Sequence, residues 1–227
     1  MREILTGIFS WPWFSQPHGY NFNGHFIRHA DGNLCIDPVE PTDEVLKEMV
    51  SHGVARILLT NRNHSRAANK VRARTGGRTA IHAADAPHAR DEGAELDDAL
   101  KPGDKVGPFV VVGVPGKSPG EIALHWPERK ILLVGDAVVS DPPGAASSYR
   151  KKWWMIQRAC ARACADFSLS TSTPYWLAMA SPLRSLPRSG FGNWWILFPS
   201  ESLSLFKRFE LLERFERLEH DSRLSQG

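Results

Sequence analysis

Short apolar segments alternate with helical patterns over the first part of the chain, and this alternation constrains the fold more than any other feature. The apolar segments have the length and the β-branched content of buried strands. They are ARILLT (55–60), TAIHAAD (79–85), PFVVVGV (108–114), EIALHW (121–126) and KILLVGDAVV (130–139). The earlier segment 21–38, NFNGHFIRHADGNLCIDP, predicts a hairpin with its turn at residues 31–33. Strands that first alternate with helices and then follow one another predict a layered α/β fold.

Two of the intervening segments predict helices. The segment 42–53 has Thr42 at its N-cap, acidic residues in its first turn and Gly53 at its end. Its apolar residues recur at helical spacing and predict one buried face. They are Val45, Leu46, Met49 and Val50. The segment 65–75 predicts a second helix, because its helix-forming residues continue until the glycine pair at 76–77.

Length and composition are those of an ordinary globular protein. The 227 residues suffice for one domain or two small ones, and 42% hydrophobic with 23% charged residues is typical of a folded chain. The sequence has no apolar run of about 18 residues and no basic segment leading into an apolar core at its start. The cysteines have neither disulfide nor zinc-ribbon spacing; they are Cys35, Cys160 and Cys164. We therefore expect a cytoplasmic protein without a membrane partner.

A polar loop that carries one histidine, TNRNHSR (60–66), directly follows the apolar run at 57–59. Many hydrolases hold zinc in a loop placed in this way. Three further motifs accompany it along the chain. They are GNLCIDP (32–38), which contains Asp37, GVPGKSPGEIAL (113–124), which is rich in glycine, and ILLVGDAV (131–138), which contains Asp136.

These four motifs, in this order and at this spacing, resemble those of the metallo-β-lactamase fold superfamily over residues from about 20 to 143. The loop at 60–66 stands where that family has Thr-His-x-His-x-Asp-His, and the loop at 113–124 stands where it has His-Thr-Pro-Gly-His-x-Pro-Gly-Ser. Asp136 stands where the family has its metal-bridging aspartate. The resemblance implies an α/β fold, the αββα sandwich of that family.

The same resemblance implies that most of the metal ligands are absent. The family binds two metal ions with histidines and aspartates at six positions of these motifs. Five of them are here Asn61, Asn63, Ser65, Arg66 and Lys117, and the sixth, Asp136, alone is retained. Zinc requires three or four electron-rich ligands, whereas Arg66 and Lys117 bring positive charge to the place of the cations. We therefore expect no cofactor and a degenerate, non-catalytic site, with zinc as the alternative.

A relocated or mononuclear metal site is the alternative hypothesis for an active hydrolase. His64 and Asp136 are its candidate catalytic groups, and His64, His82 and Asp136 are its candidate ligands; Asp85 is a further neighbour of this set. His64 falls on a spacer position of the loop, where the family's side chain points away from the metals. The remaining histidines of the first hairpin are expected at the surface, because their spacing fixes no common direction. They are His18, His25 and His29.

The two cationic side chains of the loops have two interpretations. Arg66 and Lys117 are predicted within about 6 Å of Asp136, where they form a salt bridge that fills the vacated cleft. Alternatively, they bind a small anionic molecule such as a phosphate or carboxylate, together with Asn61 and Asn63. The glycine-rich loop itself lacks the spacing of a phosphate-binding P-loop.

The last third of the chain differs in character from the rest. The basic excess behind the net charge of +3 lies entirely after residue 146, together with most of the eight tryptophans. When this segment is back-translated and read from the third base of each codon, Trp-Trp-Met-Ile at 153–156 can only give Val-Asp-Asp, and 166–180 can give a helix end and a strand. We interpret residues 147–227 as a tail that is read out of frame, poorly ordered except for a helix at 203–218.

This interpretation divides the chain into a family domain at 1–146, with the second half of its sandwich incomplete, and the tail. Under this interpretation, motifs in the tail are not evidence of a function. The cysteines at 160 and 164 and the tryptophan pairs are by-products of the frame, and we expect no nucleic-acid partner. A defective product without function is then a third hypothesis beside the non-catalytic protein and the altered hydrolase.

Overall fold

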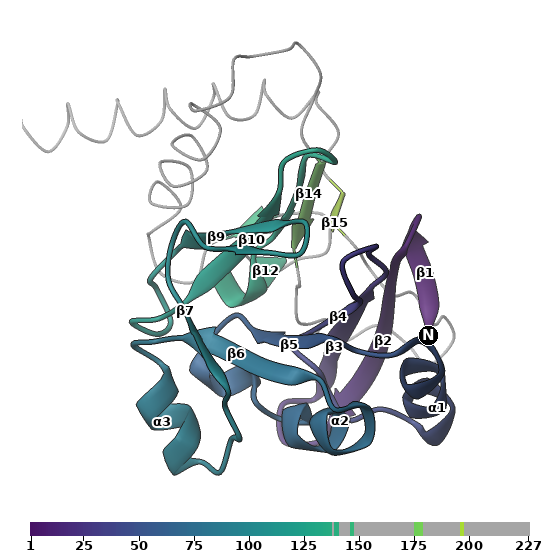
Figure 1. Cartoon of the computed structure of the whole chain (residues 1–227). Helices are drawn as coiled ribbons and strands as arrows, with labels where there is room; N and C mark the ends of the chain where they lie inside the picture. Colours follow the sequence, from purple (N-terminus) through teal and green to yellow (C-terminus); the bar gives the residue numbers. More distant parts are fainter. Residues whose placement is uncertain (138, 141–145, 148–174, 179–195, 198–227) are drawn as a thin grey trace, which may run out of the picture.

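The computed structural model describes residues 1–137, 139–140, 146–147, 175–178 and 196–197 of the chain. These residues form two sheets that pack face to face, with helices on the outer face of the first sheet (Figure 1). The layered α/β fold predicted from the sequence is therefore confirmed. The helix predicted at 203–218 and the cysteines at 160 and 164 lie outside the described residues.

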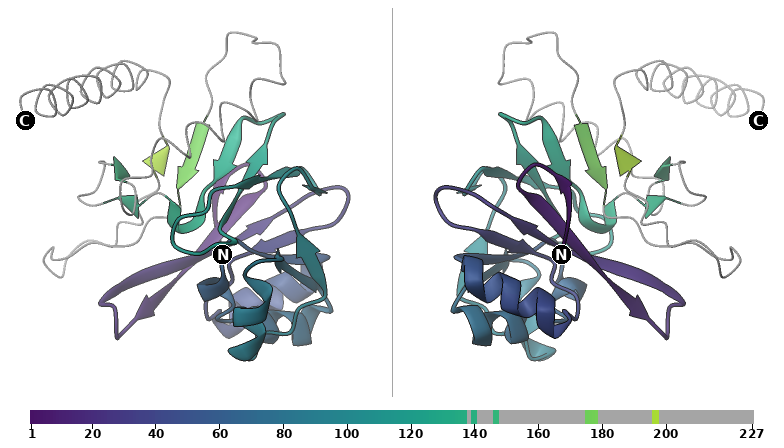
Figure 2. Two further views of the ribbon diagram at one scale, coloured as in Figure 1. Left: turned by 90° about the vertical axis from the view of Figure 1, so that its left-hand side faces the viewer. Right: turned by 90° about the vertical axis from the view of Figure 1, so that its right-hand side faces the viewer.

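The first sheet has the strand order β1-β2-β3-β4-β5-β6-β7. Its strands are β1 (Arg2–Leu5), β2 (Ile8–Ser15), β3 (Tyr20–Ile27), β4 (Leu34–Ile36), β5 (Arg56–Leu59), β6 (Arg78–His82) and β7 (Asp98–Leu100). Neighbours from β1 to β4 are antiparallel, and those from β4 to β7 are parallel. Figure 2 shows the long β2–β3 hairpin projecting to one side of the body. The parallel strands β4, β5 and β6 bring their carboxyl ends to one edge, where the polar loops begin.

The second sheet has the strand order β15-β14-β11-β10-β9-β8. Its strands are β8 (Lys105–Val106), β9 (Phe109–Gly113), β10 (Ile122–Trp126), β11 (Ile131–Leu133), β14 (Tyr175–Ala178) and β15 (Ile196–Leu197), and β12 (Val139–Ser140) pairs separately with β13 (Ala146–Ser147). β14 runs parallel to β11, with Trp176 opposite Leu132. The edge of β11 is thus paired by a strand from the segment that we interpret as out of frame, and that interpretation stays a prediction.

Three α-helices of the described residues cover the first sheet: α1 (Asp43–His52), α2 (Ala68–Thr75) and α3 (Ala86–Asp91). The predicted N-cap of α1 is confirmed, because the Thr42 side chain accepts a hydrogen bond from the Val45 backbone N–H at 3.4 Å. Gly53 and Gly76 follow α1 and α2 with positive φ angles of 74° and 73°, which glycine adopts without strain. The predicted buried face of α1 is wrong at Val50, which is 43% exposed at the rim.

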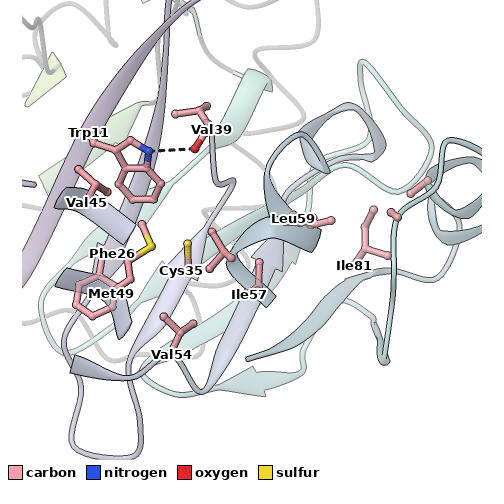
Figure 3. Close-up of a cluster of buried hydrophobic side chains, with 14 of the residues drawn as sticks. Trp11, Phe26, Cys35, Val39, Val45, Met49, Val54, Ile57, Leu59 and Ile81 are labelled. Carbon is pink, nitrogen blue, oxygen red and sulfur yellow. Dashed lines mark hydrogen bonds between the residues drawn. The ribbon is translucent and has the colours of Figure 1, made fainter. Parts of the chain in front are cut away.

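Two apolar clusters hold these layers together. Along β5, Ile57 and Leu59 face the helices, whereas Leu58 faces the second sheet, because successive side chains of a strand point to opposite sides. Figure 3 shows the cluster beneath the helices, where the Trp11 indole N–H donates to the Val39 carbonyl at 3.1 Å. Both layers of this interior were expected from the apolar segments of the sequence.

The structure corrects the expected position of one histidine of the first hairpin. His25 was expected at the surface, but it lies on β3 between β2 and β4 and is 0% exposed. Burial lowers the pKa of His25 to about 4, although the nearby charge of Asp37 acts in the opposite direction.

No helix within the described residues has the length and apolar character to cross a bilayer.

Candidate functional site

The polar loops of both sheets meet at the carboxyl ends of β4, β5 and β11. Asp37 follows β4, and the loop from Thr60 to His64 follows β5 and contains the 3₁₀ turn η1 (Arg62–His64). Asp136 lies in the 3₁₀ turn η2 (Gly135–Ala137) after β11, and Lys117 lies in the loop between β9 and β10. The four motifs identified in the sequence therefore converge in space.

Asp37 anchors the start of the first loop. Its carboxylate is 0% exposed and accepts hydrogen bonds from the Thr60 backbone N–H at 2.7 Å and from the Thr60 hydroxyl at 2.6 Å. Its backbone has a φ of 46°, a left-handed conformation that is uncommon for a residue other than glycine. The surrounding contacts must hold this conformation, and it aims the carboxylate at the loop after β5.

His64 points into the cleft, so the expectation that it points away is wrong. Its Nδ1 lies 2.9 Å from Asp37 Oδ2 and its Nε2 lies 3.1 Å from Asp136 Oδ2. The 3₁₀ turn η1 accounts for this orientation, because the Asn61 side chain accepts from the Asn63 backbone N–H at 2.9 Å and tightens the chain there. Burial alone would lower the pKa of His64, but the charges of the two carboxylates outweigh it and raise the pKa to about 9.

Asp136 is the residue on which the contacts of the cleft converge. Its Oδ2 forms an ion pair with Lys117 Nζ, and it accepts from His64 Nε2 at 3.1 Å and from Asn61 Nδ2 at 3.4 Å. Burial opposes ionisation of this carboxyl, yet the charges of His64 and Lys117 hold its pKa well below its usual range. The predicted salt bridge with Asp136 is confirmed for Lys117, and the position of Arg66 within about 6 Å of Asp136 stays a prediction.

Asp85, after β6, ties the two loops to each other. Its fully buried carboxylate accepts from the Arg62 backbone N–H at 3.0 Å, from the Gly120 backbone N–H at 2.9 Å and from the Ser118 hydroxyl. Gly120 has to lack a side chain here, because a Cβ would lie 2.7 Å from Asp85 Cγ. His82 is a neighbour of this arrangement, with its Nδ1 accepting from the Ala84 backbone N–H at 3.1 Å.

Glu121 was not identified from the sequence, where it looked like an ordinary charged residue before a strand. Its Oε2 accepts from the Lys117 backbone N–H at 2.7 Å, and within the described residues its buried Oε1 has no hydrogen-bond partner. Burial raises the pKa of this carboxyl to about 7, and the nearby charge of Asp136 acts in the same direction. Only the fold, which tucks residue 121 under the second loop, reveals this group.

Arg66 is an exposed residue directly after the loop that carries His64. Its guanidinium carbon is 4.0 Å from the centre of the Phe22 ring, so it stacks on the β2–β3 hairpin. Asn63 is half-buried in the 3₁₀ turn. Ligand binding by Arg66, Lys117, Asn61 and Asn63 stays a prediction, since the structure carries no small molecule.

The side chains around Asp136 do not fit a metal ion. Within the described residues, its three polar side-chain neighbours are the Lys117 ammonium, the His64 ring and the Asn61 amide nitrogen, and each presents a hydrogen to the carboxylate. A metal ion requires lone pairs directed at one point. No cluster of three or more His, Cys, Asp or Glu side chains in the described part of the chain is arranged for a metal ion.

Comparison with known proteins agrees with the four motifs. A family model described as the metallo-beta-lactamase superfamily matches residues 4–162, a range that extends beyond the predicted domain boundary at 146. A hydroxyacylglutathione hydrolase from Fuscovulum blasticum is 32% identical over 128 residues, which cover 52% of this chain and 49% of that protein. The chain thus spans about half the length of the curated relatives that it matches.

Solved structures with similar folds include metal-bound proteins. The metallo-β-lactamase FIM-1 from Pseudomonas aeruginosa, in its mono-zinc form, has a TM-score of 0.59 and 16% identity, with 79% of this chain and 86% of that chain covered. TTHA1623 in a di-iron-bound form has a TM-score of 0.54 and 20% identity, with 77% and 92% covered. At such identities the likeness shows the shared αββα sandwich.

Proposed function

The chain belongs to the metallo-β-lactamase superfamily, and we propose that it is a non-catalytic member whose former metal cleft binds a small anionic molecule. One observation carries the first half of the proposal. The carboxylate of Asp136 is paired with Lys117 and His64, so two protein cations stand beside the side chain that matches the family's metal-bridging aspartate. Hydrolysis by a metal-activated water requires a metal ion at that place.

The charge balance of the cleft supports the second half. The charges of Asp37 and Asp136 are compensated by His64 and Lys117, which contact them directly. The Lys117 side chain remains 33% exposed beside Asp136, and Arg66 follows the loop that carries His64. An ammonium and a guanidinium on loops that meet at one cleft support a phosphate or a carboxylate as the ligand.

Metal content tests the first half. Protein that is dialysed against metal-free buffer is expected to contain far less than one zinc, iron or manganese per chain by elemental analysis. About one bound ion per chain, lost in both His64→Gln and Asp136→Asn, contradicts the proposal, because it shows that these two side chains still act as ligands.

Titration with inorganic phosphate tests the second half. We expect binding by calorimetry and a loss of affinity of about tenfold or more in Arg66→Gln and in Lys117→Met, because each removes a charged hydrogen-bond donor. Lys70→Gln is the matched control, since Lys70 is a partly exposed lysine that pairs with Glu40 outside the cleft. Equal affinity in the two cleft variants and the control contradicts an anion site at the cleft.

A metal-dependent hydrolase with an altered site is the second candidate, and the curated relatives favour it. It would need the His64 ring to lose the hydrogen that faces Asp136 at 3.1 Å, so that both groups could act as ligands, with His82 as the third candidate. The hydroxyacylglutathione hydrolases among the relatives suggest a hydroxyacyl-glutathione thioester as the test substrate. Thioester cleavage that depends on added zinc and is lost in His64→Gln supports this candidate over the non-catalytic one.

A further inference from the structure

A chain of alternating charges connects the two sheets at the cleft. Asp37 and His64 belong to loops of the first sheet, whereas Asp136 and Lys117 belong to loops of the second. The contacts run from Asp37 to His64 at 2.9 Å, from His64 to Asp136 at 3.1 Å, and from Asp136 to Lys117 as an ion pair. The middle contact is therefore the one that crosses from one sheet to the other.

The geometry favours a His64 ring that carries both of its hydrogens. Its Nε2 faces Asp136 Oδ2 at 3.1 Å, its Nδ1 lies 2.9 Å from Asp37 Oδ2 and 3.0 Å from the Thr60 hydroxyl, and an ionised carboxylate only accepts hydrogen bonds. The ring is then an imidazolium between two anions, and the series has the signs minus, plus, minus, plus. The side chains of Asp37 and His64 are 0% and 3% exposed, so water does not screen this part of the series.

We propose that the His64 side chain has replaced the metal ions as the link that fastens the two halves of the sandwich to each other, while Lys117 balances the remaining charge of Asp136 within the second sheet. A metal ion held by ligands from both loops would join the sheets. Here the His64 ring contacts a carboxylate of each sheet instead. The link is independent of any ligand, so it extends beyond the proposed anion binding.

The physical consequence is a strong coupling between the members of the series. Removing one member leaves a buried charge without its partner, which destabilises a protein far more than losing an exposed ion pair. His64→Gln alone leaves the carboxylates of Asp37 and Asp136 without the cation between them. Adding Asp136→Asn removes one of these two charges, so the second substitution costs less than it does alone, although Asp37 stays without its cation.

A double-mutant cycle on the full chain tests the proposal by thermal unfolding. His64→Gln and Asp136→Asn are each expected to lower the melting temperature by about 10 °C, and the double variant by much less than the sum of the two. If His64→Gln alone fails to fold, recovery of folding in the double variant shows the same coupling, and no recovery overturns the proposal. Additive effects in the cycle, or losses under about 2 °C, overturn the proposal.

Two controls separate this result from the other interpretations. His88→Gln removes a histidine that pairs with Glu92 on α3 at the surface, and is expected to change the melting temperature by less than about 2 °C. A chelator and an excess of zinc are both expected to leave the melting temperature of the unmodified chain unchanged. A rise with zinc, lost in Asp136→Asn, overturns the proposal, because a metal ion then supplies the link. Failure of phosphate binding leaves these measurements unaffected, so the two proposals are tested separately.

Discussion

The space between the two sheets contains two regions that are stabilised in different ways. Deep between the sheets, apolar side chains such as Leu58, Phe109 and Leu133 pack without polar contacts. At the carboxyl ends of the strands, Asp37 and His64 are equally buried, but each of their contacts has a partner and a direction. Stability in the first region follows the apolar area removed from water, whereas in the second it depends on every charge having its partner.

The difference bears on the proposal that the chain keeps the family's fold without its metal ligands. An apolar interior tolerates substitutions that conserve volume and pattern, so the sheets form as long as the apolar segments are kept. A polar cluster tolerates only coordinated changes, because each lost partner leaves a buried charge unpaired. Under that proposal, the ion pair between Lys117 and Asp136 is such a coordinated change.

The largest expected effect concerns the completeness of the second sheet. If the frame is lost near codon 145, restoring it by adding or removing a base is expected to give a chain that ends near the codon for Pro199, with higher solubility and a higher melting temperature. The reason is that the strands and helix of the family's second half would then pack beside β11 in place of its present neighbour β14 and bury more apolar surface, at about 25 cal/mol per Å². Sequencing the gene and melting both chains checks this.

The frame prediction has a clear contrary outcome. An experimental structure in which residues 150–200 form a packed part of the domain, with the side chains of Trp153, Trp176 and Trp194 in its core, contradicts it. A restored chain that is no more soluble and melts no higher than the present one contradicts it as well.

The next largest effect separates the two regions by mutation. Leu58→Ala removes a side chain that is 0% exposed between the sheets, and it is expected to lower the free energy of unfolding by about 2–5 kcal/mol without changing phosphate affinity. Val50→Ala is the matched control, because Val50 is 43% exposed and its loss is expected to cost under about 0.5 kcal/mol. Denaturant unfolding measures both, and equal losses would show that Leu58 is not part of a packed interior.

The sequence predicts the apolar region well, for a physical reason. Apolar runs of strand length mark strands that are buried on both faces, so β5, β6, β9 and β10 could be placed from the residues alone, and so could the caps of α1. β2 was missed, because Pro12 and its three neighbouring aromatics, Trp11, Trp13 and Phe14, give no clear alternation, and α3 was missed because it has only six residues. Both elements depend on contacts with the rest of the sheet.

The polar region could be predicted only in part. Four motifs indicated that the loops converge, and opposite charges at Lys117 and Asp136 indicated their ion pair. The direction of His64 depends on the 3₁₀ turn that begins after Asn61, and the burial of Glu121 depends on how the second loop folds over it. Neither is encoded by residue type or spacing, because a turn of one residue more or less redirects a side chain without altering the pattern.

The third prediction uses pH to address the polar region alone. The pKa of His64 is raised from its ordinary value of 6.5 to about 9 in the folded chain. A raised pKa means that the folded state holds this proton more tightly than the unfolded state. The stabilisation is therefore fully present below pH 6.5 and is lost as the pH rises through about 9, by an amount of about 3 kcal/mol.

Unfolding free energies measured from pH 7 to pH 9 check this, because burial raises the pKa of the Cys35 thiol and adds a further decline above pH 9. His64→Gln is expected to remove most of the decline between pH 7 and pH 9. Glu121 contributes a separate decline at lower pH, since its carboxyl pKa is raised from 4.5 to about 7 and its stabilisation is lost as the pH rises through that value. Leu58→Ala should shift the whole curve without changing its shape. A decline that persists unchanged in His64→Gln assigns the pH dependence to another group.

The smallest expected effect concerns the tie between the two loops. Asp85→Asn keeps the size of the side chain but turns one of its two acceptors into a donor, which then faces a buried N–H or hydroxyl among Arg62, Ser118 and Gly120. One unsatisfied buried donor is expected to cost about 1–3 kcal/mol of unfolding free energy, at the low end because the other acceptor remains. Hydrogen exchange at residues 117–121 should accelerate, since the hydrogen bonds that connect the two loops are weakened.

Asp104→Asn is the control, because the Asp104 carboxylate accepts the Lys101 backbone N–H at 2.9 Å in an exposed turn. Exchange that accelerates equally in both variants contradicts the role of Asp85, whereas a selective change, together with weaker phosphate binding, shows that the position of Lys117 depends on it.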